Sequence, residues 1–213
     1  HVAEAGWSTV LKRVPEAIMT FLPITGVIML FIVIAATMHW NHIWHWMETG
    51  IMDPEAENYD YIIAGKQAYL NAPFFFIRAA VYIFGWWYAS KRLIALSRKE
   101  DTEGGLSSHK RSITISAIFI GFFGYTSSMM AWDWIMSIDP HWFSTLFGWY
   151  VFAGMFVSGI TTLALITIYL KSKNYLNFVN DSHIHDLAKF MFGVSVFWAY
   201  LWFSQFMLIW YSN

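Results

Sequence analysis

Five long apolar segments follow one another along the chain, and this succession constrains the fold more than any other feature. About 20 apolar residues allow a helix to cross the hydrocarbon layer of a bilayer. Only 13% of the 213 residues are charged, against roughly 25% in a soluble domain, and 57% are hydrophobic. The sequence therefore predicts an all-α integral membrane protein, one domain over 1–213, with five transmembrane helices near 17–38, 72–97, 113–137, 144–170 and 187–211.

Lysine and arginine are divided unequally between the two sides that five spans define. The N-terminus and the loops 98–112 and 171–186 share one side, which holds eleven of the thirteen Lys and Arg residues. The loop 39–71, the hinge 138–143 and the C-terminus share the other. The positive-inside rule predicts that the first side is cytoplasmic and the second periplasmic, in a bacterial inner membrane. An outer aromatic belt is predicted on the second side from Trp40, Trp44, Trp46, Trp132, Trp134 and Trp142.

Cysteine and histidine usage argues against a cofactor or metal in this chain. Without cysteine, the chain has neither a disulfide nor a thiolate-ligated iron–sulfur cluster. A transmembrane b-type haem needs axial histidines from facing helices, and no histidine lies in the middle of a predicted span. The trio His39, His42 and His45 would approach a metal only if it were helical, and a solvated interface is the simpler interpretation.

The stretch 132–145, WDWIMSIDPHWFST, places charged side chains between the third and fourth spans. Asp133 lies inside the third span, where an ionised carboxylate is costly and usually faces the bundle interior or a wet cavity. Two interpretations stay open for it: proton exchange or hydrogen bonding to a redox ligand near the outer face, and an interfacial aspartate reached by water. Arg78 either snorkels outward or pairs with a carboxylate such as Asp133.

The end of this stretch has the chemistry of a turn. Asp139 before Pro140 favours a local side-chain hydrogen bond, with Ser144 or Thr145 as the cap of the fourth span. Histidine is the side chain suited to proton relay at physiological pH, so His141 is a relay candidate if it contacts Asp139 or Asp133, and otherwise an ordinary interfacial histidine.

Two further polar positions have both a structural and a functional interpretation. Gln205 is the one strongly polar side chain deep in the last span, so its amide is predicted to contact another helix, as glue or as part of a polar path. At the start of that span Asp186 faces the positive end of the helix dipole, and Lys189 can pair with it. The alternative for His183, His185, Asp186 and Lys189 is the mouth of an inward proton half-channel.

The segment 132–154, WDWIMSIDPHWFSTLFGWYVFAG, resembles a signature of the smaller NrfD-like (polysulfide-reductase membrane-subunit-like) subunit of alternative complex III. That complex is a bacterial quinol:cytochrome c, or electron acceptor, oxidoreductase. The segments 69–78, YLNAPFFFIR, and 185–189, HDLAK, and the last span from 197 to 213 are similar to the same family. The resemblance implies an NrfD-like helical bundle and a parent subunit of about ten helices. The start of the chain at His1 agrees with a portion of such a parent.

The resemblance also implies partners. These are a larger NrfD-like membrane subunit, an iron–sulfur subunit and periplasmic haem c subunits, with a terminal oxidase as a further candidate and no nucleic acid. Quinol is the substrate of the complex, and the iron–sulfur clusters and haem c belong to the partners. This chain alone has no catalytic residue. By match to the motifs, the candidates for a proton path are Asp133, Asp139, His141, His185, Asp186 and Lys189, to which Gln205 is added as a polar group of the last span.

Three hypotheses follow. The first is a membrane subunit of a quinol-oxidising complex that contributes to proton transfer or translocation and anchors redox subunits. The second is a purely structural anchor without a quinone or proton site of its own. The third is a secondary transporter, which requires polar residues at the bilayer midplane. The middles of the predicted spans are mostly apolar, so the third hypothesis ranks last.

Overall fold

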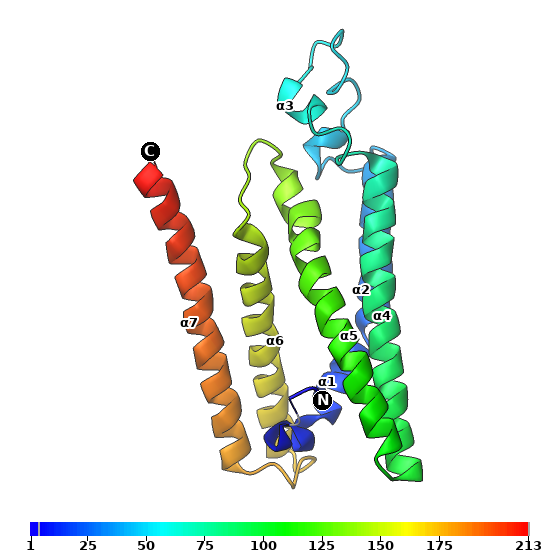
Figure 1. The fold of residues 1–213 in the computed structure, drawn as a ribbon, viewed down its shortest axis with the longest axis vertical. Coiled ribbons are helices and arrows are strands. Elements are labelled where there is room, and N and C mark those ends of the chain that lie inside the picture. Colours follow the sequence, from blue (N-terminus) through cyan, green and yellow to red (C-terminus); the bar gives the residue numbers. More distant parts are fainter. Residues whose placement is uncertain (4, 213) are drawn as a thin grey trace.

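The computed structural model describes residues 1–3 and 5–212, and these residues form helices and irregular segments without a β-strand. A 3-10 helix η1, Gly6–Leu11, and a short α1, Arg13–Met19, precede the long helices. The long helices are α2 Leu22–Thr37, α4 Ala72–Glu103, α5 Ser107–Met130, α6 Phe147–Ser172 and α7 Asp181–Ser212 (Figure 1). Shorter elements lie between them: η2 His45–Met47, α3 Tyr61–Ala64, η3 Ala131–Ile135 and η4 Met136–Ile138.

Within the described residues, four helical stretches are long and apolar enough to cross a membrane, so the chain is a multi-pass membrane protein. They are Arg13–Thr37, Ser107–Ile138, Phe147–Ser172 and Asp181–Ser212, which correspond to four of the five predicted spans. The predicted second span lies within α4. With 32 residues α4 is long enough, but it is not among the four; its sequence carries Arg78, Lys91 and Arg92 within the predicted span.

Three helix boundaries differ from the sequence prediction for local reasons. The first span is divided into α1 and α2, and Pro23 stands in the first turn of α2, where its missing N–H costs no hydrogen bond. Helix α7 begins six residues before position 187, because Asn180 and His183 cap each other: each backbone N–H donates to the other side chain, at 3.2 and 3.1 Å. The predicted cap of the fourth span by Ser144 or Thr145 is wrong, since α6 begins later, after Leu146, without a side-chain cap.

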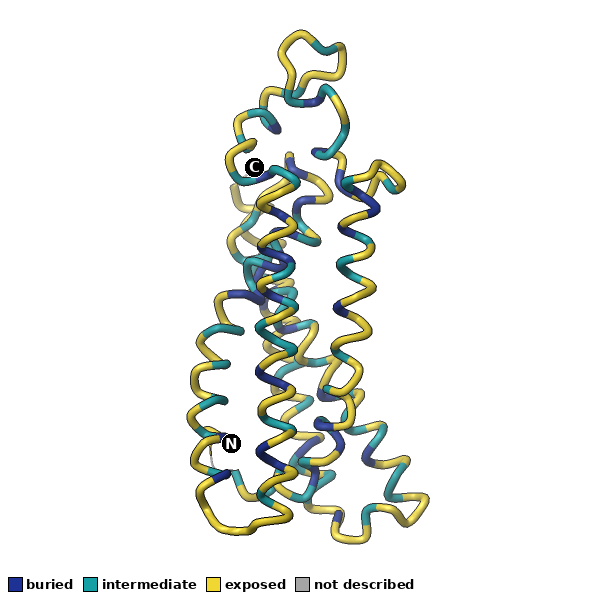
Figure 2. The backbone as a smooth tube through the Cα atoms, turned by 90° about the vertical axis from the view of Figure 1, so that its right-hand side faces the viewer, coloured by how far each residue is buried: buried dark blue, intermediate teal, exposed yellow. Residues whose placement is uncertain are grey.

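Helices α4, α5, α6 and α7 form a row, and α2 packs against α4 from behind in this view (Figure 1). Each long helix runs antiparallel to the next one along the chain. Small residues permit close approach within the row. A Cβ added at Gly148 of α6 would lie only 3.2 Å from the Cα of Ser128 on α5. Exposed residues continue along the length of the helices in the perpendicular view (Figure 2). Large apolar side chains such as Val27, Phe84 and Leu165 are among them, as expected for surfaces that contact lipid.

The row has two ends that differ in chemistry. The hinge end comprises residues 38–71, residues 136–146 and the C-terminus, and it lies at the top of Figure 1. The basic end comprises the N-terminal segment and the turns 104–106 and 173–180 at the bottom of the same view.

At the hinge end, residues 38–71 fold into a cap with an apolar core. Trp44, Trp46 and Ile51 of the cap pack with Phe75 of α4. The predicted position of Trp44 and Trp46 in an aromatic belt is wrong, because only 3% and 2% of their surfaces are exposed. A cap this small needs its largest apolar side chains inside to offset the entropy of ordering its loops. Trp40, by contrast, is 71% exposed.

Candidate functional site at the hinge end

Asp133 lies in η3, a π-helical segment that continues α5 towards the hinge. In this wider turn the backbone N–H of Met136 reaches the carbonyl of Ala131, five residues earlier. The carbonyl of Trp134 accepts a hydrogen bond from the indole N–H of Trp44 in the cap, at 3.3 Å. π-Helical turns are rare and frequently occur at functional sites.

Four hydrogen bonds surround the Asp133 carboxylate. Nε of Arg78 donates to Oδ2 at 2.8 Å and Nη2 donates to Oδ1 at 3.0 Å, so the ion pair is bidentate. The hydroxyls of Tyr69 and Tyr82 donate to Oδ1 and Oδ2 at 2.7 and 2.9 Å. We call these four residues the Asp133 cluster. It joins the cap, α4 and η3 at one point.

The Asp133 cluster is enclosed by protein. The Asp133 side chain is fully buried, and that of Arg78 is 8% exposed. The guanidinium carbon lies 4.0 Å from the ring centre of Tyr69 and 4.2 Å from that of Phe74, within the range of cation–π attraction. Its remaining Nη1 donates to the carbonyl of Tyr69 at 3.2 Å. Positive and negative charge are therefore balanced within the cluster.

The hydrogen-bond donors around the Asp133 carboxylate determine what the cluster can do chemically. Burial and the hydrogen bond to the Asp133 carboxylate raise the pKa of Tyr69, which keeps its phenol protonated and donating at neutral pH. Both oxygens of Asp133 already accept two hydrogen bonds each, so an incoming proton would have to displace a donor. The arrangement stabilises an ionised carboxylate and fastens three segments together.

The structure confirms the predicted pairing of Arg78 with Asp133, rather than an Arg78 side chain that snorkels outward. Sequence reasoning missed both tyrosines. Tyr82 follows Arg78 by four residues, one helical turn, and this spacing places both on one face of α4. Tyr69 lies in an irregular segment before α4, and no sequence signal indicates its contact with Asp133.

A second polar contact joins the cap to the hinge. His141 Nε2 lies 2.6 Å from Asp60 Oδ2, and its Nδ1 lies 3.7 Å from Asp139. Lys66 of the cap also donates to the carbonyl of Pro140. We call His141, Asp60, Lys66 and Pro140 the latch. The His141 side chain is 45% exposed, so water can reach its ring.

The carboxylates beside His141 have local structural roles. Asp60 caps α3 by accepting from the backbone N–H groups of Ile62 and Ile63 at 2.8 and 3.2 Å. Desolvation raises the pKa of Asp60, but the hydrogen bonds from Ile63, His141 and Ile62 outweigh it, and the pKa lies below its ordinary value. Asp139 accepts from the backbone N–H of His141 at 3.2 Å, the turn geometry predicted from the sequence.

Gln205 of α7 also reaches the hinge. Its Oε1 accepts a hydrogen bond from the hydroxyl of Ser144 at 2.7 Å, so its amide contacts the segment before α6 rather than lipid alone. A groove of about 270 Å³ lies beside it. Aromatic side chains dominate the lining, which comprises Trp142, Phe147, Tyr150, Trp202, Gln205, Phe206 and Ile209.

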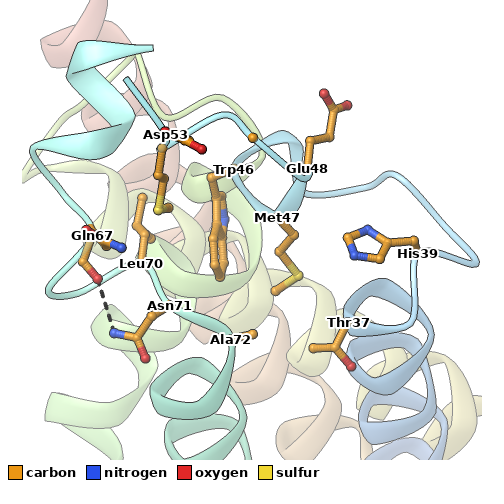
Figure 3. Close-up of a pocket in the computed structure, with 12 residues that line it drawn as sticks. Thr37, His39, Trp46, Met47, Glu48, Asp53, Gln67, Leu70, Asn71 and Ala72 are labelled. Atoms are coloured by element: carbon orange, nitrogen blue, oxygen red, sulfur yellow. Dashed lines mark hydrogen bonds between the residues drawn. The ribbon is translucent and has the colours of Figure 1, made fainter. Parts of the chain in front are cut away.

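A cleft of about 440 Å³ lies between the cap and the ends of α2 and α4 (Figure 3). Its lining includes His39, Trp46 and Glu48, and the buried indole N–H of Trp46 has no hydrogen-bond partner among the described residues. His39 follows α2 with a positive φ of 58°, whereas His45 belongs to η2 and lies 3.1 Å from Glu48. The helical alignment of the histidine trio therefore does not form. The described residues contain no group of three or more metal-ligating side chains.

The proton-path candidates at the basic end lie on the first turns of α7, far from the Asp133 cluster. Asp186 pairs with Lys189 at 3.6 Å, and both side chains are partly or largely exposed. His185 is exposed. The structure thus has the predicted surface ion pair, while a proton path through these residues stays a prediction.

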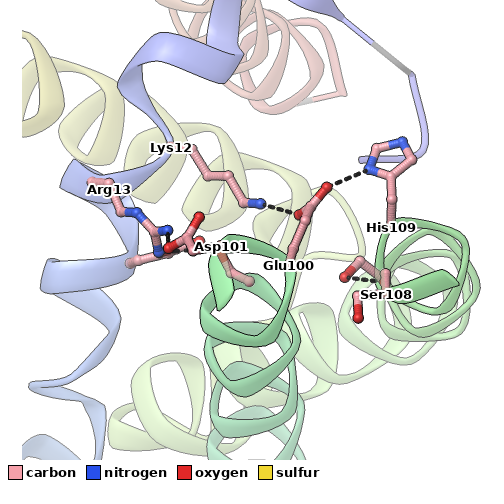
Figure 4. A network of polar contacts seen from close by, with 9 residues as sticks. Lys12, Arg13, Glu100, Asp101, Ser108 and His109 are labelled. Carbon is pink, nitrogen blue, oxygen red and sulfur yellow. Dashed lines mark hydrogen bonds and ion pairs between the residues drawn. The ribbon is translucent and has the colours of Figure 1, made fainter. Parts of the chain in front are cut away.

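A larger polar network at this end fastens the N-terminal segment to α4 (Figure 4). Lys12 donates to Glu100 at 2.9 Å, and Arg13 contacts Asp101 and, at 3.1 Å, Ser97. The hydrogen bond from Lys12 lowers the pKa of Glu100, which lies beyond the predicted span. Sequence reasoning missed this network because its partners are more than 80 residues apart.

Comparison of the sequence with protein-family models and with curated proteins found no match to either.

Proposed function

We propose that the chain is a membrane subunit of a respiratory quinol:electron acceptor oxidoreductase of the alternative complex III type. One observation carries the proposal: segments on which the resemblance rests are joined to one another at the hinge end. Segment 69–78 meets segment 132–154 in the Asp133 cluster, and the last span reaches the same hinge through Gln205 and Ser144. A chance likeness of separate apolar stretches would not require such convergence.

In this proposal α4 also crosses the membrane, so that the chain contributes five transmembrane helices to an NrfD-like bundle. It contacts both α2 and α5, runs antiparallel to them, and with 32 residues is longer than either (Figure 1). Arg78 is the cationic residue that would be most costly within the bilayer, and Asp133 balances its charge. The basic end then faces the cytoplasm of a bacterium and the hinge end faces the periplasm.

The proposed work of the hinge end is to hold periplasmic redox subunits and to pass on protons released from quinol. Electrons travel through the iron–sulfur and haem c groups of the partners, beside the larger NrfD-like subunit and, in some assemblies, a terminal oxidase. The Asp133 cluster keeps the cap rigid beneath the partners. His141 and Asp60, which are close together and reach solvent, are the groups best placed to exchange protons.

The second candidate is a purely structural anchor, and the saturated carboxylate of Asp133 favours it. A carboxylate that already accepts four hydrogen bonds is better suited to fastening helices than to relaying protons. Both candidates share the same assembly and differ only in whether protons pass through this chain.

A tagged chain purified from its native membranes in mild detergent tests the proposal. We expect haem c and iron–sulfur proteins to co-purify, and the preparation to reduce cytochrome c with quinol as the electron donor. A preparation without haem c and without quinol oxidation would refute the function.

Two variants then separate the two candidates. His141→Gln and Asp60→Asn should lower the proton yield per quinol while the complex still assembles, whereas Glu57→Gln, an exposed acid of the same cap, should not. An unchanged proton yield in all three would favour the anchor.

A further inference from the structure

A groove of about 410 Å³ lies near the basic end, between the junction of α1 with α2 and the facing side of α4. Met19, Thr20 and Pro23 line it from the junction. Helix α4 supplies the opposite wall with Trp87, Ser90, Lys91, Ile94, Ala95 and Arg98. The groove thus combines a mainly apolar lining with two cations.

The two cations face the groove together and are available to a ligand. Lys91 and Arg98 are seven residues apart, two turns of helix, which places them on one face of α4. Both are exposed, and neither forms an ion pair with a carboxylate among the described residues. Lys91 Nζ lies 5.0 Å from the ring centre of Trp87.

The acids nearest along α4 do not neutralise these cations, because they are committed elsewhere. Glu100 pairs with Lys12 at 2.9 Å, and Asp101 pairs with Arg13. Figure 4 shows these pairs, which hold the N-terminal segment against α4. The same network therefore supports one wall of the groove and leaves its positive charge uncompensated.

If α4 crosses the bilayer, as the proposed function has it, the groove lies at the boundary between hydrocarbon and headgroups. Lys91 follows the first residue of α4, Ala72, by 19 residues. At 1.5 Å per residue this is roughly 29 Å, close to the ~30 Å hydrocarbon layer of a bilayer. Trp87 lies one turn below Lys91, where interfacial tryptophans occur, and Arg98 lies beyond the hydrocarbon.

We propose that this groove binds one anionic phospholipid. Its phosphate lies between Lys91 and Arg98, and an acyl chain follows the apolar lining past Trp87 and Pro23. A basic pocket between membrane helices at the basic end suits an anionic headgroup. The mainly apolar lining argues for a lipid rather than for free phosphate, which would leave Met19 and Ile94 uncovered.

Native mass spectrometry of the purified full chain in detergent tests the proposal. The chain is titrated separately with phosphatidylglycerol, phosphatidylcholine and inorganic phosphate. We expect one tightly held phosphatidylglycerol, weaker phosphatidylcholine, and no competition from millimolar inorganic phosphate.

The variant Lys91→Gln/Arg98→Gln should weaken phosphatidylglycerol binding roughly tenfold, since each basic residue near an anionic lipid contributes to its attraction. The matched control Arg111→Gln/Lys173→Gln removes one arginine and one lysine that are exposed at the same end but lie outside the groove, and it should bind as the wild type does.

Equal binding of both lipids by the wild type would overturn the proposal. So would equal loss in both variants, or full displacement of the lipid by inorganic phosphate. Circular dichroism of both variants checks that the helices are retained.

Discussion

Asp133 and Arg78 bring opposite charges into a site that excludes water, so each depends on the other. Removal of one partner from a buried ion pair typically costs about 3–5 kcal/mol, because it leaves an uncompensated charge. We therefore expect Asp133→Asn and Arg78→Gln each to lower the free energy of unfolding by about that amount. Reversible unfolding in mixed detergent micelles measures it.

A double variant separates the ion pair from its surroundings. Arg78→Met/Asp133→Leu removes both charges together and should recover a large part of the loss, because no unpaired charge remains buried. Asp139→Asn is the control: this side chain is 71% exposed, and we expect a change within about 0.5 kcal/mol. A double variant as unstable as the sum of the single ones would show that the pair itself is not the source of the stability.

The latch gives a prediction for acid conditions. Because the folded-state pKa of Asp60 lies below its ordinary value of 3.8, its ionised form stabilises the fold above that value. This stabilisation is lost as the pH falls below 3.8 and through the folded-state pKa. We therefore expect the loss of stability from pH 5 to pH 3 to be smaller in Asp60→Asn than in the wild type, measured by thermal unfolding at each pH. Parallel curves for the two proteins would contradict it.

At the scale of elements, the contact of α6 with α5 depends on a glycine. A side chain at Gly148 would meet the backbone of Ser128, which cannot move aside as a flexible side chain would. Overpacking of this kind typically costs about 1–3 kcal/mol, and we expect that loss for Gly148→Leu. Gly159→Leu is a control in the same helix, since nothing lies within 4 Å of an added Cβ there. Equal stability of the two variants would show that α5 and α6 tolerate a wider separation.

The elements also show what the sequence could predict. Apolar length located the four helices that are long and apolar enough to cross a membrane, because this signal is local. The turn at Asp139 followed from the proline after it. The partners of Asp133 were only partly predictable: charge suggested Arg78, but Tyr69 depends on how the cap folds. The burial of Trp44 and Trp46 depends on the same long-range packing, which periodicity does not encode.

For the whole molecule, the topology depends on whether α4 crosses the bilayer. Its 32 residues provide ample length, and the pairing of Arg78 with Asp133 removes the largest single electrostatic objection. If α4 crosses, the cap and the turn after α4 lie on opposite sides of the membrane. If it does not, the two lie on the same side.

The absence of cysteine makes this topology directly measurable, because one introduced cysteine reports one loop. We expect a membrane-impermeant maleimide to label Glu57→Cys and Phe143→Cys on intact spheroplasts, and to label Leu106→Cys and Tyr175→Cys only after permeabilisation. Phe143, Leu106 and Tyr175 are each more than 70% exposed, and Glu57 lies on the exposed cap, so access within the protein does not limit the reaction. Identical labelling at positions 57 and 106 would show that α4 does not cross, since the two loops are then on one side. Opposite labelling would establish that α4 crosses and place the Asp133 cluster at the periplasmic boundary, where the proposed function needs it.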